Sequence, residues 1–170
     1  MRKLLFILLG FIAQSAFAQP VVVKNNDPRL HYMGRVNVTN DATEFSWPGN
    51  SVKINFNGTY VKAVIKDEFG ANYFKVIVDG KVLPNDLKVD ATRHIYTLVS
   101  DLPAGKHTLE LFKRTEWLFG KTWLYQFELD KDIDAAPETH KRKIEFYGNS
   151  ITCGYAVIDT TGQDLSLIHI

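Results

Sequence analysis

Residues 73–83 read YFKVIVDGKVL, with apolar side chains at alternate positions before a two-residue turn. Phe74, Val76 and Val78 recur with the period of two that is typical of a half-buried β-strand. Asp79-Gly80 supplies residues that readily adopt the positive φ angles of a tight hairpin turn. The stretch therefore predicts a β-hairpin with one face in an apolar core.

The same alternation recurs along the chain, as in VKINFN at 52–57 and WLYQFEL at 123–129. In the second stretch, Trp123, Tyr125 and Phe127 share one strand face, which predicts that they lie in the core. About eight or nine short strands separated by Gly, Pro and Asn turns are typical of a jelly-roll-like β-sandwich, the mainly β fold that we predict. The other expected strands are residues 34–38, 44–47, 60–66, 94–99 and 108–113.

The composition is that of a globular chain. Of the 170 residues, 45% are hydrophobic and 23% are charged, which excludes a disordered or collagen-like chain. Cys153 is the single cysteine, so neither an internal disulfide nor a metal site built on several thiolates forms within the chain. The longest basic run, HKRK at 140–143, is too short to predict nucleic-acid binding. We expect no nucleic-acid partner, no metal and no organic cofactor.

Residues 1–18 have the pattern of a secretory signal peptide. Arg2 and Lys3 precede an apolar run at 4–13, and AFA at 16–18 offers small residues for cleavage. The run is shorter than the roughly 20 apolar residues that span a bilayer, so we expect no membrane association after cleavage. Because Arg2 and Lys3 leave with the signal, 18 of the 20 basic residues remain against 19 acidic ones. The sequence predicts a secreted or periplasmic protein.

A charged segment without apolar alternation follows the last predicted strand. Residues 131–142 are expected to form a linker after a sandwich domain at 19–130. A short strand at 143–147 then leads into Gly148-Asn149-Ser150. A serine in a tight turn between a strand and a helix exposes its hydroxyl, and the free N–H groups there can stabilise an oxyanion. The alternative is an ordinary loop in which Asn149 and Ser150 only cap a helix.

The stretch IEFYGNSITCGY at 144–155 resembles the nucleophile block of the SGNH hydrolases and, more narrowly, that of carbohydrate esterase family 2, the acetyl xylan esterases. Two upstream stretches agree with the N-terminal domain of that family, so the resemblance spans nearly all of the chain after residue 18. Where this chain has Asn149, SGNH proteins more often have Asp. The upstream stretches are MGR at 33–35 with FSWPGN at 45–50 and FNGT at 56–59, and KRTE at 113–116 with Gly120 and Asp130.

This resemblance implies a β-sandwich joined to an SGNH α/β domain, with Ser150 as catalytic nucleophile and backbone oxyanion donor. An SGNH domain is a parallel sheet with crossover helices, so residues 143–164 would supply only its first strand and nucleophile turn. The family takes its general base from a late histidine, and we expect this chain to be a C-terminally truncated, inactive fragment. Residues 165–170, LSLIHI, resemble a translated sequencing adapter and are expected to be a non-native tail.

The histidines and the cysteine receive ordinary roles in this interpretation. His169 belongs to the expected tail, and Cys153 follows the nucleophile position, so it is expected to pack. Histidines in a sandwich or a linker are commonly exposed or hydrogen-bonded structural residues. That role is expected for His31, His94, His107 and His140.

Aromatic side chains are candidates for binding a sugar, because their faces suit the C–H faces of a pyranose ring. Trp117, in a loop between Glu116 and Gly120, is the best candidate for a substrate-binding residue. Most of the others are expected to be core. The set considered is Trp47, Trp117, Phe119, Trp123 and Tyr125.

The sequence therefore predicts a carbohydrate esterase that removes acetyl groups from plant-type polysaccharide by serine catalysis. Its expected partner is an acetylated polysaccharide or oligosaccharide. One alternative is a non-catalytic carbohydrate-binding sandwich, which an exposed strip of aromatic rings would favour over buried ones. A second alternative is a sandwich that only braces a catalytic domain.

Overall fold

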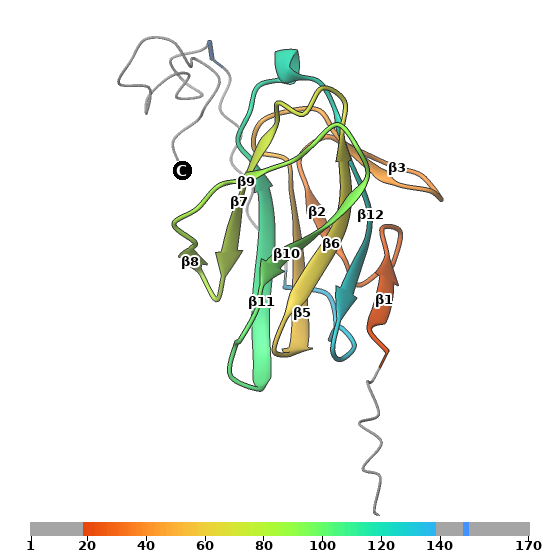
Figure 1. Cartoon of the computed structure of the whole chain (residues 1–170), viewed down its shortest axis with the longest axis vertical. Coiled ribbons are helices and arrows are strands. Elements are labelled where there is room, and N and C mark those ends of the chain that lie inside the picture. Colours follow the sequence, from red (N-terminus) through yellow and green to blue (C-terminus); the bar gives the residue numbers. More distant parts are fainter. Residues whose placement is uncertain (1–18, 139–147, 150–170) are drawn as a thin grey trace, which may run out of the picture.

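The computed structural model describes residues 19–138 and 148–149, and the strands between residues 21 and 129 form two antiparallel sheets packed face to face (Figure 1). The β-sandwich predicted from the alternating pattern is confirmed. Within the described part of the chain, no helix is long and apolar enough to cross a membrane. The predicted signal peptide at 1–18, most of the serine block at 143–164 and the predicted tail at 165–170 lie outside the described residues.

The first sheet is built around its long central strand, β12. One edge of β12 pairs with β6, which in turn pairs with β10, and the other edge pairs with β1 and with β4, which carries β3. All these pairings are antiparallel. The strands are β1 (Val21–Lys24), β3 (Val36–Val38), β4 (Thr43–Phe45), β6 (Val61–Asp67), β10 (His94–Val99) and β12 (Thr122–Leu129).

The second sheet is built around β11, which pairs with β5 on one side and β7 on the other. β2 extends the sheet beyond β5, and β8 and β9 both pair with β7. The strands are β2 (His31–Met33), β5 (Ser51–Gly58), β7 (Tyr73–Val78), β8 (Lys81–Val82), β9 (Leu87–Lys88) and β11 (Gly105–Lys113).

One apolar core lies between the sheets. Val52, Ile54 and Phe56 are fully buried, as their alternation predicts. Phe45 of the first sheet meets Phe74 of the second edge to face, with ring centroids 6.0 Å apart. Burial of a side chain of this size contributes roughly 1.5–3 kcal/mol, so the core is the main source of stability in a chain without an internal disulfide.

The predicted Asp79-Gly80 hairpin forms between β7 and β8. Both residues have positive φ, 50° and 76°, as the central residues of a type I′ turn require. The Asp79 carboxylate accepts a hydrogen bond from the Thr108 N–H at 2.8 Å and lies 2.7 Å from His107 Nδ1. His107 Nε2 lies 2.8 Å from the Pro103 carbonyl oxygen. The Pro103 carbonyl and the Asp79 carboxylate raise the pKa of His107, because both favour the doubly protonated ring.

A bulge in β12 changes which aromatic residues face the core. The register against β6 shifts between Leu124 and Gln126. Leu124 and Phe127 are therefore both buried, whereas Trp123 and Tyr125 are only half-buried. The prediction that Trp123, Tyr125 and Phe127 share one core face is wrong for the first two, because the extra residue reverses the alternation within the strand.

Cations cover the two aromatic rings that the bulge turns outward. Lys66 Nζ lies 5.7 Å from the centroid of the Trp123 ring. The Arg93 guanidinium carbon lies 3.8 Å from the centroid of the Tyr125 ring. Such cation–π contacts occupy aromatic faces that a ligand would otherwise use, so this part of the sheet is not an open aromatic strip.

The first part of the predicted linker lies against the sandwich. Ile133 is 4% exposed, belongs to the core and forms an isolated antiparallel bridge with Phe56 of β5. The Asp134 N–H donates to the Asn55 carbonyl at 2.8 Å, and Asn55 Nδ2 donates to the Ala135 carbonyl at 3.2 Å. The pattern gave no sign of this packing, because Ile133 is a single apolar residue among charged ones. The domain boundary at residue 131 stays a prediction.

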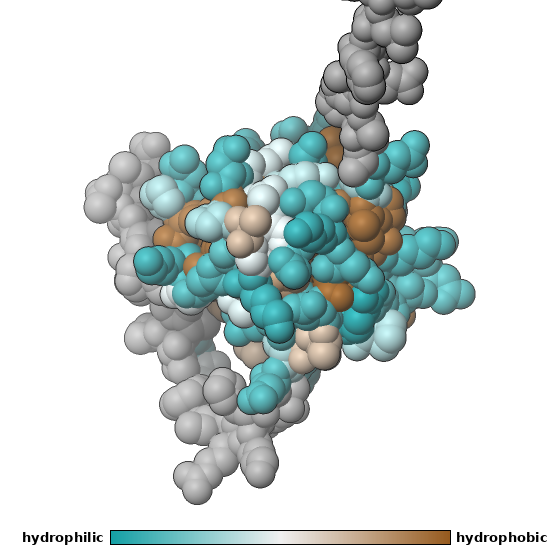
Figure 2. Space-filling view, turned by 90° about the horizontal axis from the view of Figure 1, so that it is seen from below, coloured by the Kyte–Doolittle hydropathy of each residue, from teal (hydrophilic) through white to brown (hydrophobic). Residues whose placement is uncertain are grey.

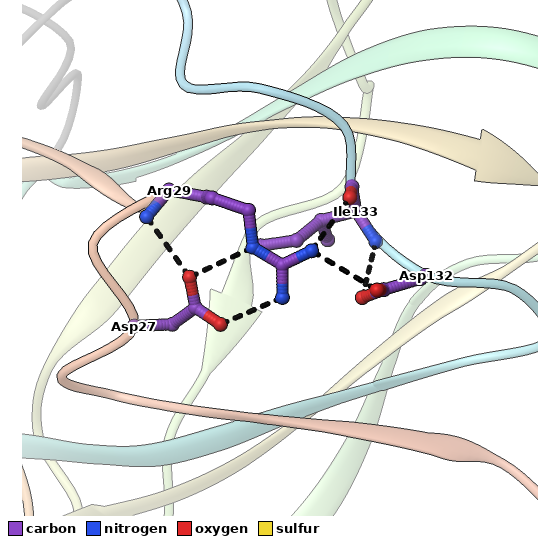
Figure 3. Close-up of polar contacts among 4 residues, drawn as sticks. All are labelled: Asp27, Arg29, Asp132 and Ile133. Atoms are coloured by element: carbon purple, nitrogen blue, oxygen red, sulfur yellow. Dashed lines mark hydrogen bonds and ion pairs between the residues drawn. The ribbon is translucent and has the colours of Figure 1, made fainter.

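Arg29 holds the same segment from the loop between β1 and β2 (Figure 3). Its Nε and Nη2 donate to the two carboxylate oxygens of Asp27 at 2.9 and 2.7 Å. Its Nη1 donates to Asp132 Oδ2 at 3.0 Å and to the Ile133 carbonyl at 2.9 Å. The hydrogen bonds from Arg29 lower the pKa of both carboxylates, since they stabilise the charged forms. One guanidinium thus joins two segments far apart in the sequence.

Candidate functional site

Trp47 and Trp117 lie side by side at the end of the sandwich where the chain crosses between the sheets. Trp47 follows β4, and Trp117 begins a short 3₁₀ turn, η1 (Trp117–Phe119), between β11 and β12, at the top of Figure 1. Their ring centroids are 6.4 Å apart and the ring planes meet at 43°. Trp47 is 45% exposed and Trp117 is 55% exposed. The pair therefore offers apolar ring surface to a ligand at this end.

Two further large apolar side chains are exposed around the pair. Leu118 follows Trp117 in η1, and Phe69 lies on the neighbouring loop between β6 and β7. A Cβ on Gly120 would lie 2.7 Å from Phe69 Cδ2, and Gly120 has a φ of 87°, so the space and the backbone both require glycine there. Figure 2 shows the opposite end of the sandwich, where the coloured surface is mostly hydrophilic. The exposed apolar patch at the η1 end is typical of an interaction site.

Asn50 holds the turn that carries Trp47. Its Oδ1 accepts from the Trp47 N–H at 3.0 Å, and its own N–H donates to the Trp47 carbonyl at 3.3 Å. A Cβ on Gly34 would overlap Asn50 Nδ2, and Gly34 has a φ of 83°, so glycine there leaves room for the buried amide. The MGR and FSWPGN motifs, separate in the sequence, therefore meet beside Trp47.

The pockets at the two ends differ in chemistry. A pocket of about 320 Å³ opens beside Trp47, and Arg35 is its charged residue; the others are Gly34, Trp47, Pro48, Gly49 and Asn50. A larger hollow of about 590 Å³ lies where residues 134–138 pass β5 and β11. None of the described residues that line the larger hollow is Trp, Tyr or Phe. Because an aromatic wall suits a sugar ring, we take the smaller pocket as part of the candidate site.

A buried polar cluster supports η1 from the inside. Asp67 Oδ1 accepts hydrogen bonds from the N–H groups of residues 69–71 at 3.1, 2.7 and 3.1 Å. Asp67 Oδ2 accepts from Asn72 Nδ2 and from Thr122 Oγ1, each at 2.7 Å. Asn72 Nδ2 also donates to the Phe119 carbonyl at 2.9 Å. The cluster thus fixes the loop of Phe69 and the end of η1 together.

Lys113 completes the cluster as a fully buried cation at the end of β11. Burial lowers the pKa of Lys113 to about 8, and the carboxylates of Asp67 and Glu116 act in the opposite direction. A buried ammonium is stable only when hydrogen-bonded, so the groups around Lys113 are held to it.

The predicted site residues fall in different parts of the chain. Trp117 is exposed beside Trp47, a position that a substrate-binding residue needs, and its binding role stays a prediction. Ser150 lies outside the described residues, so its catalytic role also stays a prediction. His107 is held by Asp79, and His94 Nε2 lies 2.6 Å from Thr92 Oγ1, as expected for structural histidines.

The sequence analysis missed the residues that hold the tryptophans in place. Asn50, Asp67, Asn72 and Lys113 carry no catalytic pattern, and they are separated in the sequence. Two motifs of the family resemblance, FSWPGN and KRTE, contain Asn50 and Lys113 and could have indicated these two residues. Among the described residues, no group of three His, Cys, Asp or Glu side chains is placed to hold a metal ion.

Comparison with known proteins agrees with the resemblance noted in the motifs. Cellulase/esterase CelE of Acetivibrio thermocellus is 40% identical over 132 residues, which are 76% of this chain and 16% of that protein. An acetylxylan esterase / glucomannan deacetylase of Cellvibrio japonicus is 30% identical over 153 residues, 89% of this chain and 42% of that protein. The chain thus spans less than half the length of each of these relatives.

A solved structure and a family profile also indicate similarity to family 2 carbohydrate esterases. The structure of a family two carbohydrate esterase from Clostridium thermocellum in complex with cellohexaose has a TM-score of 0.70 and 40% identity, covering 75% of this chain and 39% of that chain. The profile of the carbohydrate esterase 2 N-terminal domain matches residues 32–138, which include both exposed tryptophans and the polar cluster. The chain therefore belongs to carbohydrate esterase family 2, and residues 32–138 match the N-terminal domain of that family.

Proposed function

We propose that this chain is part of a carbohydrate esterase that removes acetyl groups from plant-type polysaccharide. We also propose that Trp47 and Trp117 bind the sugar chain. The observation that carries the proposal is the exposed tryptophan pair on a domain of this family. Relatives named as acetylxylan esterases and a structure with bound cellohexaose support a glycan ligand. Aromatic faces bind sugars through apolar contact, while the nearby Arg35 can donate hydrogen bonds to hydroxyl oxygens.

The proposed chemistry is nucleophilic catalysis by Ser150. The Ser150 oxygen attacks the acetyl carbonyl, and a histidine from the family's late block takes the hydroxyl proton and passes it to the departing sugar oxygen. Water then releases acetate from the acyl-enzyme. The similarity of residues 144–155 to the family's nucleophile block supports this role. Export by residues 1–18 is part of the proposal, and N-terminal sequencing of the secreted protein should begin at Gln19.

The first experiment measures binding of cellohexaose and xylohexaose to the 170-residue chain by calorimetry. Trp47→Ala and Trp117→Ala should each weaken binding about tenfold, the equivalent of 1.4 kcal/mol of lost contact. Trp123→Ala is the matched control, because this half-buried tryptophan of β12 has its ring covered by Lys66. Equal binding by all four proteins would show that the pair does not bind the sugar.

The second experiment measures acetate release from acetylated xylan. The 170-residue chain should release none, because without a base the serine is a weak nucleophile. The longer protein expected from the sequence should release acetate, and Ser150→Ala should lower its rate by on the order of 10⁴-fold or more. Full activity of Ser150→Ala would contradict the assignment of the nucleophile.

A second candidate function is glycan binding without catalysis. It is favoured by the exposure of both tryptophans on the sandwich itself. A longer protein that binds the hexasaccharide and releases no acetate would support this candidate. A 170-residue chain that binds neither hexasaccharide, together with a longer protein that releases acetate, would instead favour a sandwich that only braces a catalytic domain.

A further inference from the structure

The main chain of Lys113 is bonded to the turn that carries Trp47. The Lys113 N–H donates to the Asn50 carbonyl at 2.9 Å, and the Gly49 N–H donates to the Lys113 carbonyl at 2.9 Å. These two bonds continue the pairing of β5 with β11 into the turn after Trp47. The position of Trp47 therefore depends on where Lys113 lies at the end of β11.

The side chain of Lys113 is bonded to the loop that carries Trp117. Its Nζ donates to the Thr115 carbonyl at 2.7 Å and to the Glu116 carbonyl at 3.4 Å. The Glu116 carbonyl belongs to the peptide bond that leads into Trp117. Nζ also lies 3.3 Å from Thr115 Oγ1, which donates in turn to Asn72 Oδ1. Lys113 is thus hydrogen-bonded to both loops that carry the exposed tryptophans.

Because this cation is buried, each of its hydrogen bonds must be made by a protein group. Lys113 is fully buried, so its ammonium has no water to replace a lost acceptor. A charged group in that position is strongly destabilising unless its donors are satisfied. The two carbonyls must therefore stay turned toward Nζ, and this direction of the peptide groups fixes how the chain enters η1.

We propose that Lys113 is the positioning residue that sets the arrangement of Trp47 and Trp117. It touches no ligand and acts through the two loops. Its effect on glycan binding rests on the proposed function, whereas its effect on the tryptophan pair does not. The role differs from general stabilisation, because loss of Lys113 should change the geometry of the pair in a chain that still folds.

Circular dichroism reports that geometry directly. Two indole rings with centroids 6.4 Å apart couple their electronic transitions and give an exciton couplet, which depends on their distance and angle. Trp47→Phe and Trp117→Phe should each abolish the couplet, and Trp123→Phe should leave it. These three variants assign the signal to the pair before Lys113 is changed.

The test replaces Lys113 by Met, which keeps an unbranched apolar chain of similar length and removes the donors. Lys113→Met should still fold, which a cooperative unfolding transition would show. It should keep only a small fraction of the couplet and bind cellohexaose about tenfold more weakly than the unmodified chain. Lys113→Arg, which keeps the charge and the donors, should retain more of both signals. Lys75→Met is the matched control, because Lys75 donates to the backbone carbonyls of Leu83 and Pro84 and pairs with Asp86, which belong to neither tryptophan loop.

A couplet and an affinity in Lys113→Met equal to those of the unmodified chain would overturn the proposal. If Lys113→Met does not fold, Lys113→Gln takes its place: its neutral amide, on a side chain one bond shorter, keeps polar hydrogens at the buried position but cannot hold both carbonyls as Nζ does, and an unchanged couplet there would overturn the proposal equally. A lost couplet in a protein whose unmodified form binds no cellohexaose would support the positioning role and contradict the proposed function. The two ideas can therefore fail separately.

Discussion

The carboxylate of Asp130 occupies the space that a side chain on Gly58 would need. A Cβ on Gly58 would overlap Asp130 Oδ1 and lie 3.1 Å from its Cγ. Both carboxylate oxygens accept from the Thr59 N–H at 3.0 Å, and Oδ2 accepts from Thr59 Oγ1 at 2.8 Å. Burial acts to raise the pKa of Asp130, but the hydrogen bonds from Thr59, together with those from the backbone of Asp130 and Tyr60, outweigh it and the pKa is lowered. The residue after β12 thus closes the turn between β5 and β6.

Gly58→Ala should destabilise the chain by about 1–3 kcal/mol, because the new methyl group must displace the Asp130 carboxylate from Thr59. Urea unfolding followed by far-ultraviolet circular dichroism measures the change. Gly105→Ala is the control, since Gly105 pairs with Gly58 across the sheet and a Cβ there meets no atom within 4 Å. A Gly58→Ala chain as stable as Gly105→Ala would show that the carboxylate moves aside at no cost.

Arg29→Ala should expose the bond after Lys131 to trypsin. In the unmodified chain, Arg29 holds Asp132 and the Ile133 carbonyl, so this bond should be cut slowly. Loss of the guanidinium leaves the segment with fewer contacts, and local opening should become at least several times more frequent. Mass spectrometry of the fragment ending at Lys131 follows the cleavage. Arg93→Ala, which removes a guanidinium from the Tyr125 ring, should leave the rate unchanged, and equal rates for both variants would contradict the role of Arg29.

His107→Gln should cost stability mainly at low pH. Because the folded state raises the pKa of His107 above 6.5, the contribution of the protonated ring is fully present below that pH and is lost as the pH rises through the folded value. The contribution should stay below about 1 kcal/mol, since the pair with Asp79 lies near the surface. Urea midpoints at about pH 5.5 and about pH 9 test the sign. A larger cost at the higher pH would contradict the two hydrogen bonds assigned to the ring.

The free energy of unfolding of the unmodified chain should rise relative to that of Lys113→Met as the pH becomes alkaline. The pKa of Lys113 is lowered from 10.5 to about 8 on folding, so below pH 8 the charge is buried at full cost. As the pH rises from 8 toward 10.5, the folded state loses the proton first and the difference between the two proteins should shift in favour of Lys113, by at most about 3 kcal/mol. Denaturation midpoints of both proteins across this range measure it. A difference that does not change with pH would contradict the lowered pKa.

The strands with regular alternation could be predicted from the sequence, because their side chains report burial directly. Residues 94–99 were predicted as a strand and form β10 with the same bounds. Residues 21–24 and 31–33 were not predicted, since β1 is a short run beside the expected cleavage site and β2 carries two half-buried residues and one exposed residue. The bulge in β12 could not be predicted either, because the pairing of β12 with β6 decides where the extra residue is accommodated.

The candidate site could be predicted only in part. Trp117 could be selected because it is an aromatic residue in a loop, between Glu116 and Gly120, and not on a strand with core alternation. Its neighbour Trp47 is seventy positions earlier, and only the crossing between sheets brings the two rings together. Lys113 could not be recognised as buried, because a lysine at the end of a strand is normally solvated. Its Nζ is held by the carbonyls of Thr115 and Glu116, just after it in the chain, and Thr115 Oγ1 is joined in turn to Asn72 on another loop.

The order of residues along β11 and into η1 has a consequence for how this domain can diversify. Leu111 closes the apolar core, Lys113 and Thr115 form a polar layer, and Trp117 comes last, at the surface. The layer separates the side chains that drive folding from those that meet solvent. Substitutions at Trp47, Trp117 or Leu118 can therefore accumulate with little effect on folding, and the proposed sugar site can change on an unchanged scaffold.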